Sequence, residues 1–461
     1  MAQQQLSGHP KGLYILFFTE LWERFSFYGM RAILVLFLVA SSTGDNPGFG
    51  WTESDALKLY AWYTFLVYLS SIPGGILADK WLGQKKTVYL GGALLVVGHS
   101  ILAVQALWAF YTGLAFIIAG VGCLKPNIST MVGGLYAPGD ERRDKGFTIF
   151  YIGINIGAFL SALIVGYVGE THGWHYGFGL AGIGMAIGQI VFMMGQKHLK
   201  GVGEASKSLS ASEQAAKKKP LTKVEKDRIV VMLISFLLII VFWGAFEQAG
   251  GLMNLYADQK TDRTLSFLNW EIPASWFQSV NAFFIITLGA PVAAFWYNWK
   301  HKGKESSSIF KMALGVIIMG WGFLFMAAAS NQFENEGSSA MYWLVLAYLF
   351  HTIGELCASP VALSYITKLS PLKYASIMMG VYFAATGLGN YVAGWVGVWS
   401  QSAGELEIFM GIAIFCTLIG GLVIAMLKPL KRLAHGAEDL VDIPRDNTLQ
   451  METNPSQHSN N

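Results

Sequence analysis

Residues 203–220 read GEASKSLSASEQAAKKKP, a polar and basic segment that divides a chain made mostly of long apolar stretches. An apolar stretch of about 20 residues is long enough for a helix to cross a bilayer. Six such stretches precede the segment and six follow it. We therefore predict twelve transmembrane helices, at approximately 13–40, 55–78, 86–106, 109–136, 146–168, 175–196, 229–257, 274–298, 308–330, 340–366, 374–398 and 405–428.

The amino-acid composition excludes most classes of soluble protein. Of the 461 residues, 53% are hydrophobic and 13% are charged, whereas soluble domains carry about 25% charged residues. So few charges cannot coat a soluble chain of this length, and a net charge of +3 gives no reason to expect a nucleic-acid partner. Cys123, Cys357 and Cys416 lie in apolar runs, and no Cys/His spacing suggests a metal site. We predict an all-α membrane protein that is not an enzyme and binds no metal.

Lysine and arginine are distributed unevenly between the two sides of these spans. With the N-terminus in the cytoplasm, 25 of them fall in the N-terminus, the even-numbered loops and the C-terminal tail. Only Lys260 and Arg263 fall in the opposite loops. Because cytoplasmic loops are enriched in basic residues, we expect both termini in the cytoplasm. The expected location is the plasma membrane, as a multi-pass protein of the bacterial inner membrane.

Two six-helix halves joined by a basic cytoplasmic loop are typical of the major facilitator fold, in which the halves rock about a site near the middle of the membrane. The expected parts are a cytoplasmic N-terminus (1–12), an N-terminal six-helix bundle (13–196), a basic cytoplasmic linker (197–228), a C-terminal six-helix bundle (229–430) and a polar cytoplasmic tail (431–461). The linker has no apolar run long enough for extra helices, so twelve spans are predicted and not fourteen.

Charged residues inside the predicted spans indicate the candidate site, because a charge near the bilayer centre is costly without a partner or a water-filled cavity. In the span 13–40, ELWERFSFYGMR places four charges and two aromatic rings within roughly 140° of one helix face. These residues are Glu20, Glu23, Arg24, Phe27, Tyr28 and Arg31. Other spans contribute Lys125, Glu247 and Glu355. Four carboxylates against three bases predict mutually paired residues around a polar interior.

These charges are divided between the halves in a way that suits a small zwitterion. The first half supplies the bases Arg24, Arg31 and Lys125, whereas the second half supplies only the carboxylates Glu247 and Glu355. A molecule with a carboxylate at one end and an ammonium at the other would be oriented by this arrangement. Polar side chains that can line the same cavity are Asn155, Gln278, Asn281 and Ser359.

Structural alternatives remain open for several of these residues. Glu20, Glu23 and Arg24 could form a static packing network, and Lys125 could extend to the membrane interface. We interpret His99 and His351 as hydrogen-bonded packing histidines in preference to proton carriers. Among Tyr60, Tyr63 and Tyr68, some are expected at the membrane interface and one or two in the cavity.

The motifs resemble those of the proton-dependent oligopeptide transporter family, over nearly the whole chain. Glu20–Gly29 is similar to the family pattern E-x-x-E-R-F-x-Y-Y-G, with Phe27 in place of the first Tyr. GGILADKWLGQKKT (Gly74–Thr87) resembles the first family signature and the facilitator loop motif, and FTIFYIGINIG resembles the second signature. CLKPNIS, FEQAG, QSVN and GE-x-x-x-SP follow in the family's order.

The resemblance implies roles for individual residues. Arg31 and Lys125, with Asn155 and Tyr28 beside them, are implied to bind the carboxylate of a peptide. Glu355 is implied to bind its amino terminus, with Ser359 and Asn281 in support. Tyr68 and Tyr382 are expected to line the same site, Tyr382 standing where many bacterial members have Trp. The proton-coupling residues implied are Glu20, Glu23, Arg24, Lys125 and Glu247. Asp79 and Lys80 are expected to latch a cytoplasmic gate.

The implied function is proton-coupled import of di- and tripeptides by alternating access, with protons as the coupling ion and no other cofactor. Tyr63 occupies the position where animal members of the family have a histidine. A histidine at this position therefore cannot be the proton acceptor in this chain. An alternative is a facilitator-type symporter of another small organic solute, such as amino acids or nitrate. A membrane-embedded enzyme or a receptor is a further alternative, although no nucleophile–base pair or appended soluble domain is visible.

Overall fold

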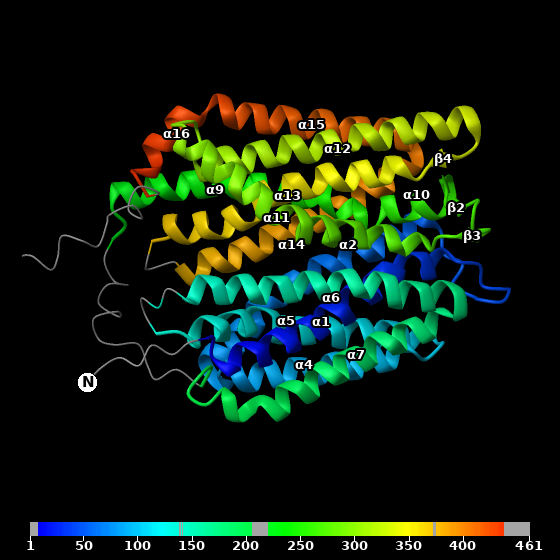
Figure 1. The fold of residues 1–461 in the computed structure, drawn as a ribbon, viewed down its shortest axis with the longest axis horizontal. Coiled ribbons are helices and arrows are strands. Elements are labelled where there is room, and N and C mark those ends of the chain that lie inside the picture. The colour runs from blue at the N-terminus through cyan, green and yellow to red at the C-terminus, as the bar shows by residue number, and fades with distance from the viewer. Residues whose placement is uncertain (1–7, 138–139, 141, 205–219, 372–374, 438–461) are drawn as a thin grey trace, which may run out of the picture.

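The computed structural model describes residues 8–137, 140, 142–204, 220–371 and 375–437. They form a bundle of long helices that run along one common direction (Figure 1). The first half contains α1 (Lys11–Val39), α2 (Glu53–Leu69), α3 (Ser71–Leu77), the π-helical turn η1 (Ala78–Leu82), α4 (Gln84–Leu102), α5 (Leu107–Gly134), α6 (Arg142–His172), α7 (Trp174–Met194) and the 3₁₀ turn η2 (Gly195–His198).

The second half begins with α9 (Lys223–Phe246), the 3₁₀ turn η3 (Glu247–Ala249) and α10 (Leu252–Lys260). It continues with the 3₁₀ turn η4 (Ala274–Trp276), α11 (Phe277–His301), α12 (Ser308–Glu336), α13 (Tyr342–Leu369), α14 (Ala375–Ala403), α15 (Glu405–Ala425) and α16 (Leu427–Ala434). Two short strand pairs lie at one end of the bundle: β1 (Thr261–Asp262) is parallel to β4 (Ser339–Ala340), and β2 (Thr264–Leu265) is antiparallel to β3 (Trp270–Glu271). We call this the strand end, and the opposite end the α16 end.

Nine helical segments within the described residues are long and apolar enough to cross a membrane. Three other long helices, α1, α4 and α14, pack among them. In α1, charged residues lower the hydropathy, yet four of them, Glu20, Glu23, Arg24 and Arg31, are buried in the protein interior. The predicted helical, multi-pass class is therefore confirmed, with two short strand pairs as the exception to an all-α fold. The count of twelve spans stays a prediction.

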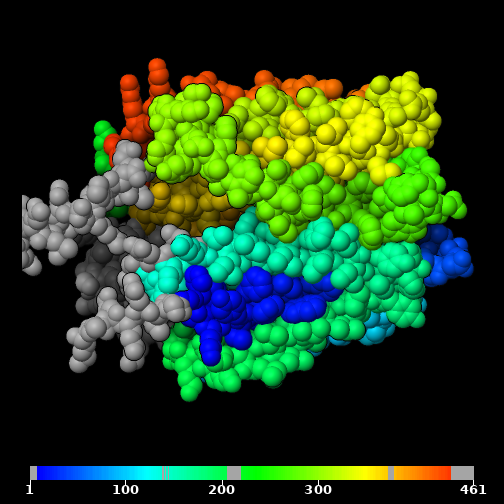
Figure 2. Space-filling model, in the orientation of Figure 1, coloured from blue at the N-terminus to red at the C-terminus, as the bar shows by residue number. Residues whose placement is uncertain are grey.

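The helices pack into two groups that correspond to the two halves, one below the other in Figure 1. In the first half α1 packs on α6 and α7, and α4 packs on α5 and α7. In the second half α12 packs on α13 and α15, and α9 on α14. Contacts of α2 with α14 and of α6 with α11 join the halves. Figure 2 shows a gold surface, in the colour range shared by the end of α13 and α14, set back between the halves toward the α16 end.

Two predicted spans are not single helices. The stretch 229–257 is interrupted after Phe246, where η3 and Gly250–Gly251 separate α9 from α10. A Cβ atom on Gly250 would lie 2.0 Å from the Tyr60 hydroxyl, so the absence of a side chain allows the close approach of α2. The stretch 55–78 is interrupted at Ser70, and Pro73 lies in the first turn of α3, where no backbone N–H is needed. The first of these breaks places Glu247 outside a regular α-helix.

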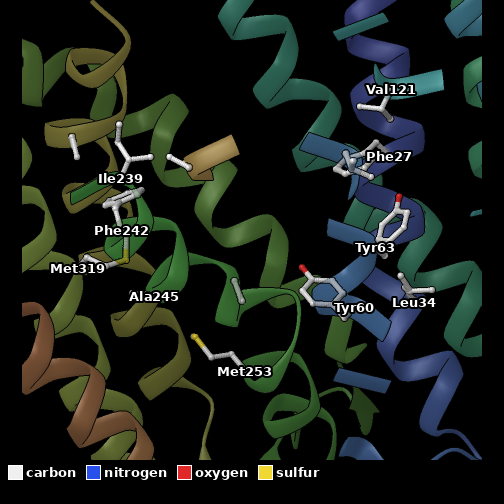
Figure 3. Close-up of a cluster of buried hydrophobic side chains, with 14 of the residues drawn as sticks. Phe27, Leu34, Tyr60, Tyr63, Val121, Ile239, Phe242, Ala245, Met253 and Met319 are labelled. Carbon is white, nitrogen blue, oxygen red and sulfur yellow. The ribbon is translucent and has the colours of Figure 1, made fainter. Parts of the chain in front are cut away.

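Apolar side chains fill the space between helices in both halves. Figure 3 shows part of this core, with Phe27 and Tyr63 on one side and Ile239 and Phe242 on the other. Tyr60 lies between the two groups. Buried polar residues at the boundary between the halves therefore have little access to water, and their contacts are mainly with one another.

Candidate substrate and proton site

Glu20, Glu23 and Arg24 form one ionic cluster on α1. The i, i+3 and i+4 spacing puts the three side chains on the same face, and each is at most 3% exposed. The Arg24 Nε atom lies 3.0 Å from Glu20 Oε1 and also forms an ion pair with Glu23. Two carboxylates thus share a single guanidinium in a dry environment. Such a cluster can carry a proton on one carboxylate without leaving Arg24 unpaired.

Lys125 lies on α5 at the edge of this cluster and forms no salt bridge with any described residue. Its Nζ atom lies 3.8 Å from the centre of the Tyr68 ring on α2, a cation–π contact. The expectation that Lys125 is part of a paired charge set is therefore not met in this conformation, because its ammonium faces an aromatic ring. A lysine held in this way keeps its charge available for a ligand carboxylate or for Glu20 and Glu23.

Arg31 on α1 and Glu247 in η3 join the two halves. Arg31 Nη1 donates hydrogen bonds to both carboxylate oxygens, at 3.0 and 3.1 Å, and the guanidinium lies 4.8 Å from the centre of the Tyr28 ring. The Tyr60 hydroxyl donates a third hydrogen bond to Glu247, at 2.8 Å. Arg31 was expected to meet a ligand carboxylate, but in this conformation a protein carboxylate occupies it. Tyr60 is a site residue that the sequence did not single out, since nothing in its spacing distinguishes it from Tyr63.

Glu355 on α13 is the charged centre of the second half. The Asn281 amide on α11 donates hydrogen bonds to Glu355 Oε2 at 2.9 Å and to the Thr352 hydroxyl at 3.0 Å. Glu355 forms no ion pair with the residues described. A buried carboxylate with one amide donor and no cation suits an ammonium ligand, because the ligand would supply the missing positive charge.

The remaining candidate substrate residues have different surroundings. Ser359 and Tyr382 line one small pocket, with α9 and α12 side chains such as Phe242 and Met312. Asn155 is buried, and its amide donates to the Tyr151 carbonyl of its own helix at 2.9 Å. The structure thus brings Ser359 and Tyr382 together, whereas Asn155 makes no hydrogen bond to Arg31 or Lys125 in the residues described.

The predicted gate and histidine residues lie away from these contacts. Asp79 and Lys80 are exposed on η1 and form no salt bridge within the described part of the chain. His99 and His351 are buried, and neither ring nitrogen of either residue has a partner among the described residues. The expectation that they are hydrogen-bonded was therefore wrong for the described residues. The His351 ring packs instead on an aromatic ring, with its centre 4.5 Å from that of Phe323. The described part of the chain contains no cluster of three or more His, Cys, Asp or Glu side chains able to hold a metal ion.

A protein-family model described as the POT family matches residues 85–215 and 204–403. The chain belongs to the POT family. It is 34% identical to the peptide transporter YePEPT of Yersinia enterocolitica, over 94% of this chain and 96% of that protein. It is also 34% identical to a di-/tripeptide transporter of Lactococcus lactis subsp. cremoris, over 94% of this chain and 98% of that protein. The resemblance inferred from the motifs is confirmed.

Solved structures of POT transporters have the same fold. A crystal structure of a mutant peptide transporter POT in complex with sulfate matches with a TM-score of 0.86 and 32% identity, covering 94% of this chain and 97% of that one. A mutant POT in complex with alafosfalin matches with a TM-score of 0.85, 33% identity and the same coverage. A POT family transporter in complex with 5-aminolevulinic acid has a TM-score of 0.84 at 27% identity, over 93% of this chain and 99% of that one.

Proposed function

We propose that this POT family protein is a proton-coupled symporter that imports di- and tripeptides by alternating access. The observation that carries the proposal is the separation of unpaired charges between the halves. Among the described residues, Lys125 in the first half contacts an aromatic ring and forms no salt bridge, and Glu355 in the second half is hydrogen-bonded by a neutral amide and forms no salt bridge. A peptide carboxylate and ammonium would complete both contacts at once. A nitrate symporter or an embedded enzyme would not require this complementary pair. A free amino acid carries the same two charges, so the transport test below has to separate amino acids from peptides.

The proposed topology has twelve transmembrane helices and both termini in the cytoplasm of a bacterial inner membrane. The nine apolar helices and the long helices α1, α4 and α14 together support that count. The start of α1 and the whole of α16 lie at the same end of the bundle (Figure 1). The loops rich in Lys and Arg are at this end too. We assign the α16 end to the cytoplasm and the strand end to the outside.

We assign the structure to an inward-facing state. Hydrogen bonds between the halves gather toward the strand end, including Asn254 Nδ2 to the Ala32 carbonyl at 2.9 Å and Arg31 to Glu247. The recessed gold surface of α13 and α14 at the α16 end supports the same assignment (Figure 2). Outward opening would have to break the Arg31–Glu247 contact, which would free Arg31 to meet a ligand carboxylate as its motif implies.

The proposed coupling uses the cluster on α1. A proton from outside neutralises Glu20 or Glu23, which weakens the attraction to Arg24 and Lys125. These bases can then pair with the peptide carboxylate, while Asn155, Tyr28, Tyr68, Ser359 and Tyr382 line the cavity around the peptide. Release of the peptide and proton inward restores the cluster. A membrane potential of 100 mV adds about 2.3 kcal/mol per charge moved. Asp79 and Lys80 would act at the cytoplasmic gate, and no cofactor other than protons takes part.

The test is uptake into liposomes that contain the purified protein and carry an imposed inward proton gradient. A panel of labelled di- and tripeptides, free amino acids and nitrate would be compared, with protein-free liposomes as the control. We expect accumulation of peptides above equilibrium that a protonophore abolishes. Accumulation of amino acids or nitrate without competition by peptides would support the alternative solutes. No gradient-driven movement of any peptide would overturn the proposal.

A further inference from the structure

Glu170, near the C-terminal end of α6 in the first half, contacts the start of the α11 segment in the second half. Its two carboxylate oxygens accept hydrogen bonds from the backbone N–H groups of Ala274, at 2.8 Å, and Ser275, at 2.9 Å. η4 runs directly into α11, so these N–H groups begin a continuous helical segment, Ala274–His301. The first N–H groups of a helix have no partner within it and attract a negative charge. The first half thus supplies the cap for a helix of the second half.

Two other contacts strengthen this junction. The Trp276 indole N–H donates to the Leu163 carbonyl of α6 at 2.9 Å. A Cβ atom on Gly166 would lie 2.0 Å from the Ser275 hydroxyl oxygen, so only glycine permits this approach. Residues 163, 166 and 170 follow one another at i, i+3 and i+7, which places them on one face of α6. We call this set of contacts the α6–η4 latch.

Both sides of the latch are held by their own half. On the η4 side, the Arg263 guanidinium donates to the Ile272 carbonyl at 2.6 Å and pairs with Glu271 at 2.8 Å, which braces the β2–β3 hairpin before η4. On the α6 side, the Asn46 amide donates to the Gly169 carbonyl at 2.9 Å, next to Glu170. α6 and η4 are thus each fixed to their own half. A relative movement of the halves therefore has to break the contacts between α6 and η4, because neither segment can move independently of its half.

We infer that the α6–η4 latch positions the two halves in the inward-facing state and must open before the extracellular side can open. The inference rests on the proposed alternating access and adds to it a junction built from α6 and η4. This junction is distinct from the Arg31–Glu247 contact, which uses α1 and η3. Glu170, Gly166 and Trp276 are positioning residues. Within the described part of the chain, none of them forms a hydrogen bond or an ion pair with the ionic cluster on α1 or with Glu355.

The latch is tested by distances across the extracellular end, measured by double electron–electron resonance without any substrate. Spin labels would be attached at Ser42→Cys and Ser338→Cys, two exposed loop positions in different halves, after replacement of Cys123, Cys357 and Cys416 by serine. In this background Glu170→Ala and Trp276→Phe each remove part of the latch. Thr171→Ala is the matched control, since Thr171 is exposed and, within the described residues, its hydroxyl is hydrogen-bonded to the Tyr167 carbonyl and the His172 ring of its own helix and to nothing in the second half.

We expect Glu170→Ala to enlarge the long-distance population between about twofold and thirtyfold, the range of effects for a lost helix cap. Trp276→Phe should enlarge it less, and Thr171→Ala should leave it unchanged. Glu170→Gln keeps one carbonyl oxygen as an acceptor and is a smaller change than alanine. It should give a long-distance population between those of the parent and of Glu170→Ala. In liposomes Glu170→Ala should lower the external KM for peptide, because more molecules present the outward state. Distances that stay at the parent values in folded Glu170→Ala and Trp276→Phe proteins would overturn the inference, whether or not peptide is transported.

Discussion

Arg31 Nη1 lies 3.0 Å from one oxygen of Glu247 and 3.1 Å from the other, across the boundary between the two halves. Both side chains are at least nine-tenths buried, so neither can replace its partner with bulk water. Removal of one partner from such a pair is costly because it leaves an uncompensated buried charge. The pair therefore holds the halves together only while both members are charged and close.

The Tyr60 hydroxyl completes this contact, and its loss should be measurable. Tyr60→Phe removes the 2.8 Å hydrogen bond to Glu247 and should lower the free energy of unfolding by about 1.5–3 kcal/mol, the usual range for a hydrogen bond to a charged group. Tyr63→Phe is the matched control, since the buried Tyr63 hydroxyl has no hydrogen-bond partner among the residues that the structure describes. Thermal unfolding in detergent would compare the two. Equal midpoints for the two variants would show that the Tyr60 hydroxyl adds nothing to this junction.

Glu20 and Glu23 share the Arg24 guanidinium in the α1 cluster. From this arrangement we predict that their substitution affects proton-driven accumulation but not counterflow exchange. Glu20→Gln or Glu23→Gln removes a titratable carboxylate beside Arg24, so proton-driven accumulation should be lost while counterflow exchange of peptide remains measurable. Glu407→Gln, an exposed change in the first turn of α15, is the control and should leave both unchanged. Driven uptake that survived in both α1 variants would remove the coupling role from this cluster.

The motif that begins GGILADK contains two adjacent glycines with opposite expected responses to substitution. A Cβ atom on Gly74 would lie 1.9 Å from the Gly122 carbonyl oxygen, whereas one on Gly75 would meet nothing within 4 Å. Gly74→Ala should therefore lower the free energy of unfolding by about 1–3 kcal/mol through overpacking of α3 on α5. Gly75→Ala should leave it unchanged or raise it by up to about 1 kcal/mol, because alanine favours a helix. The two unfolding midpoints check this, and the reverse order would contradict the packing described.

A pH-dependent contact is expected at the α16 end. Burial tends to raise the pKa of Glu305, but hydrogen bonds from Ser307 and from Lys431, at 2.9 Å, outweigh it and lower the pKa from 4.5 to about 2. A lowered pKa means that the contact stabilises the fold above about pH 4.5 and that this contribution disappears as the pH falls toward 2. Since both side chains are partly exposed, the contribution should be at most about 1 kcal/mol.

Glu305→Gln should accordingly lower the unfolding midpoint slightly at pH 7, and the difference from the parent should shrink as the pH is lowered through 4 to 3. Glu334→Gln, at an exposed carboxylate near the strand end, provides the comparison and should show no such pH-dependent difference. A constant difference at all pH values would mean that the charge of Glu305 is not what matters at this position.

The sequence by itself determined the helical membrane class, the division at the basic segment and the local cluster on α1. These features depend on nearest neighbours along the chain: long apolar runs form helices in lipid, and the spacing of Glu20, Glu23 and Arg24 places them on one face of any helix. Glu355 could also be singled out, because a carboxylate is rare within an apolar span.

Only the tertiary structure decided which charges meet. Arg31 and Glu247 are 216 residues apart, Tyr60 reaches the same carboxylate from a third element, and Glu170 caps a helix more than 100 residues later. No local periodicity encodes these contacts, since they depend on how two packed halves are oriented toward each other. That orientation changes in a transporter that alternates, so the same sequence supports contacts in one state that it must release in the other.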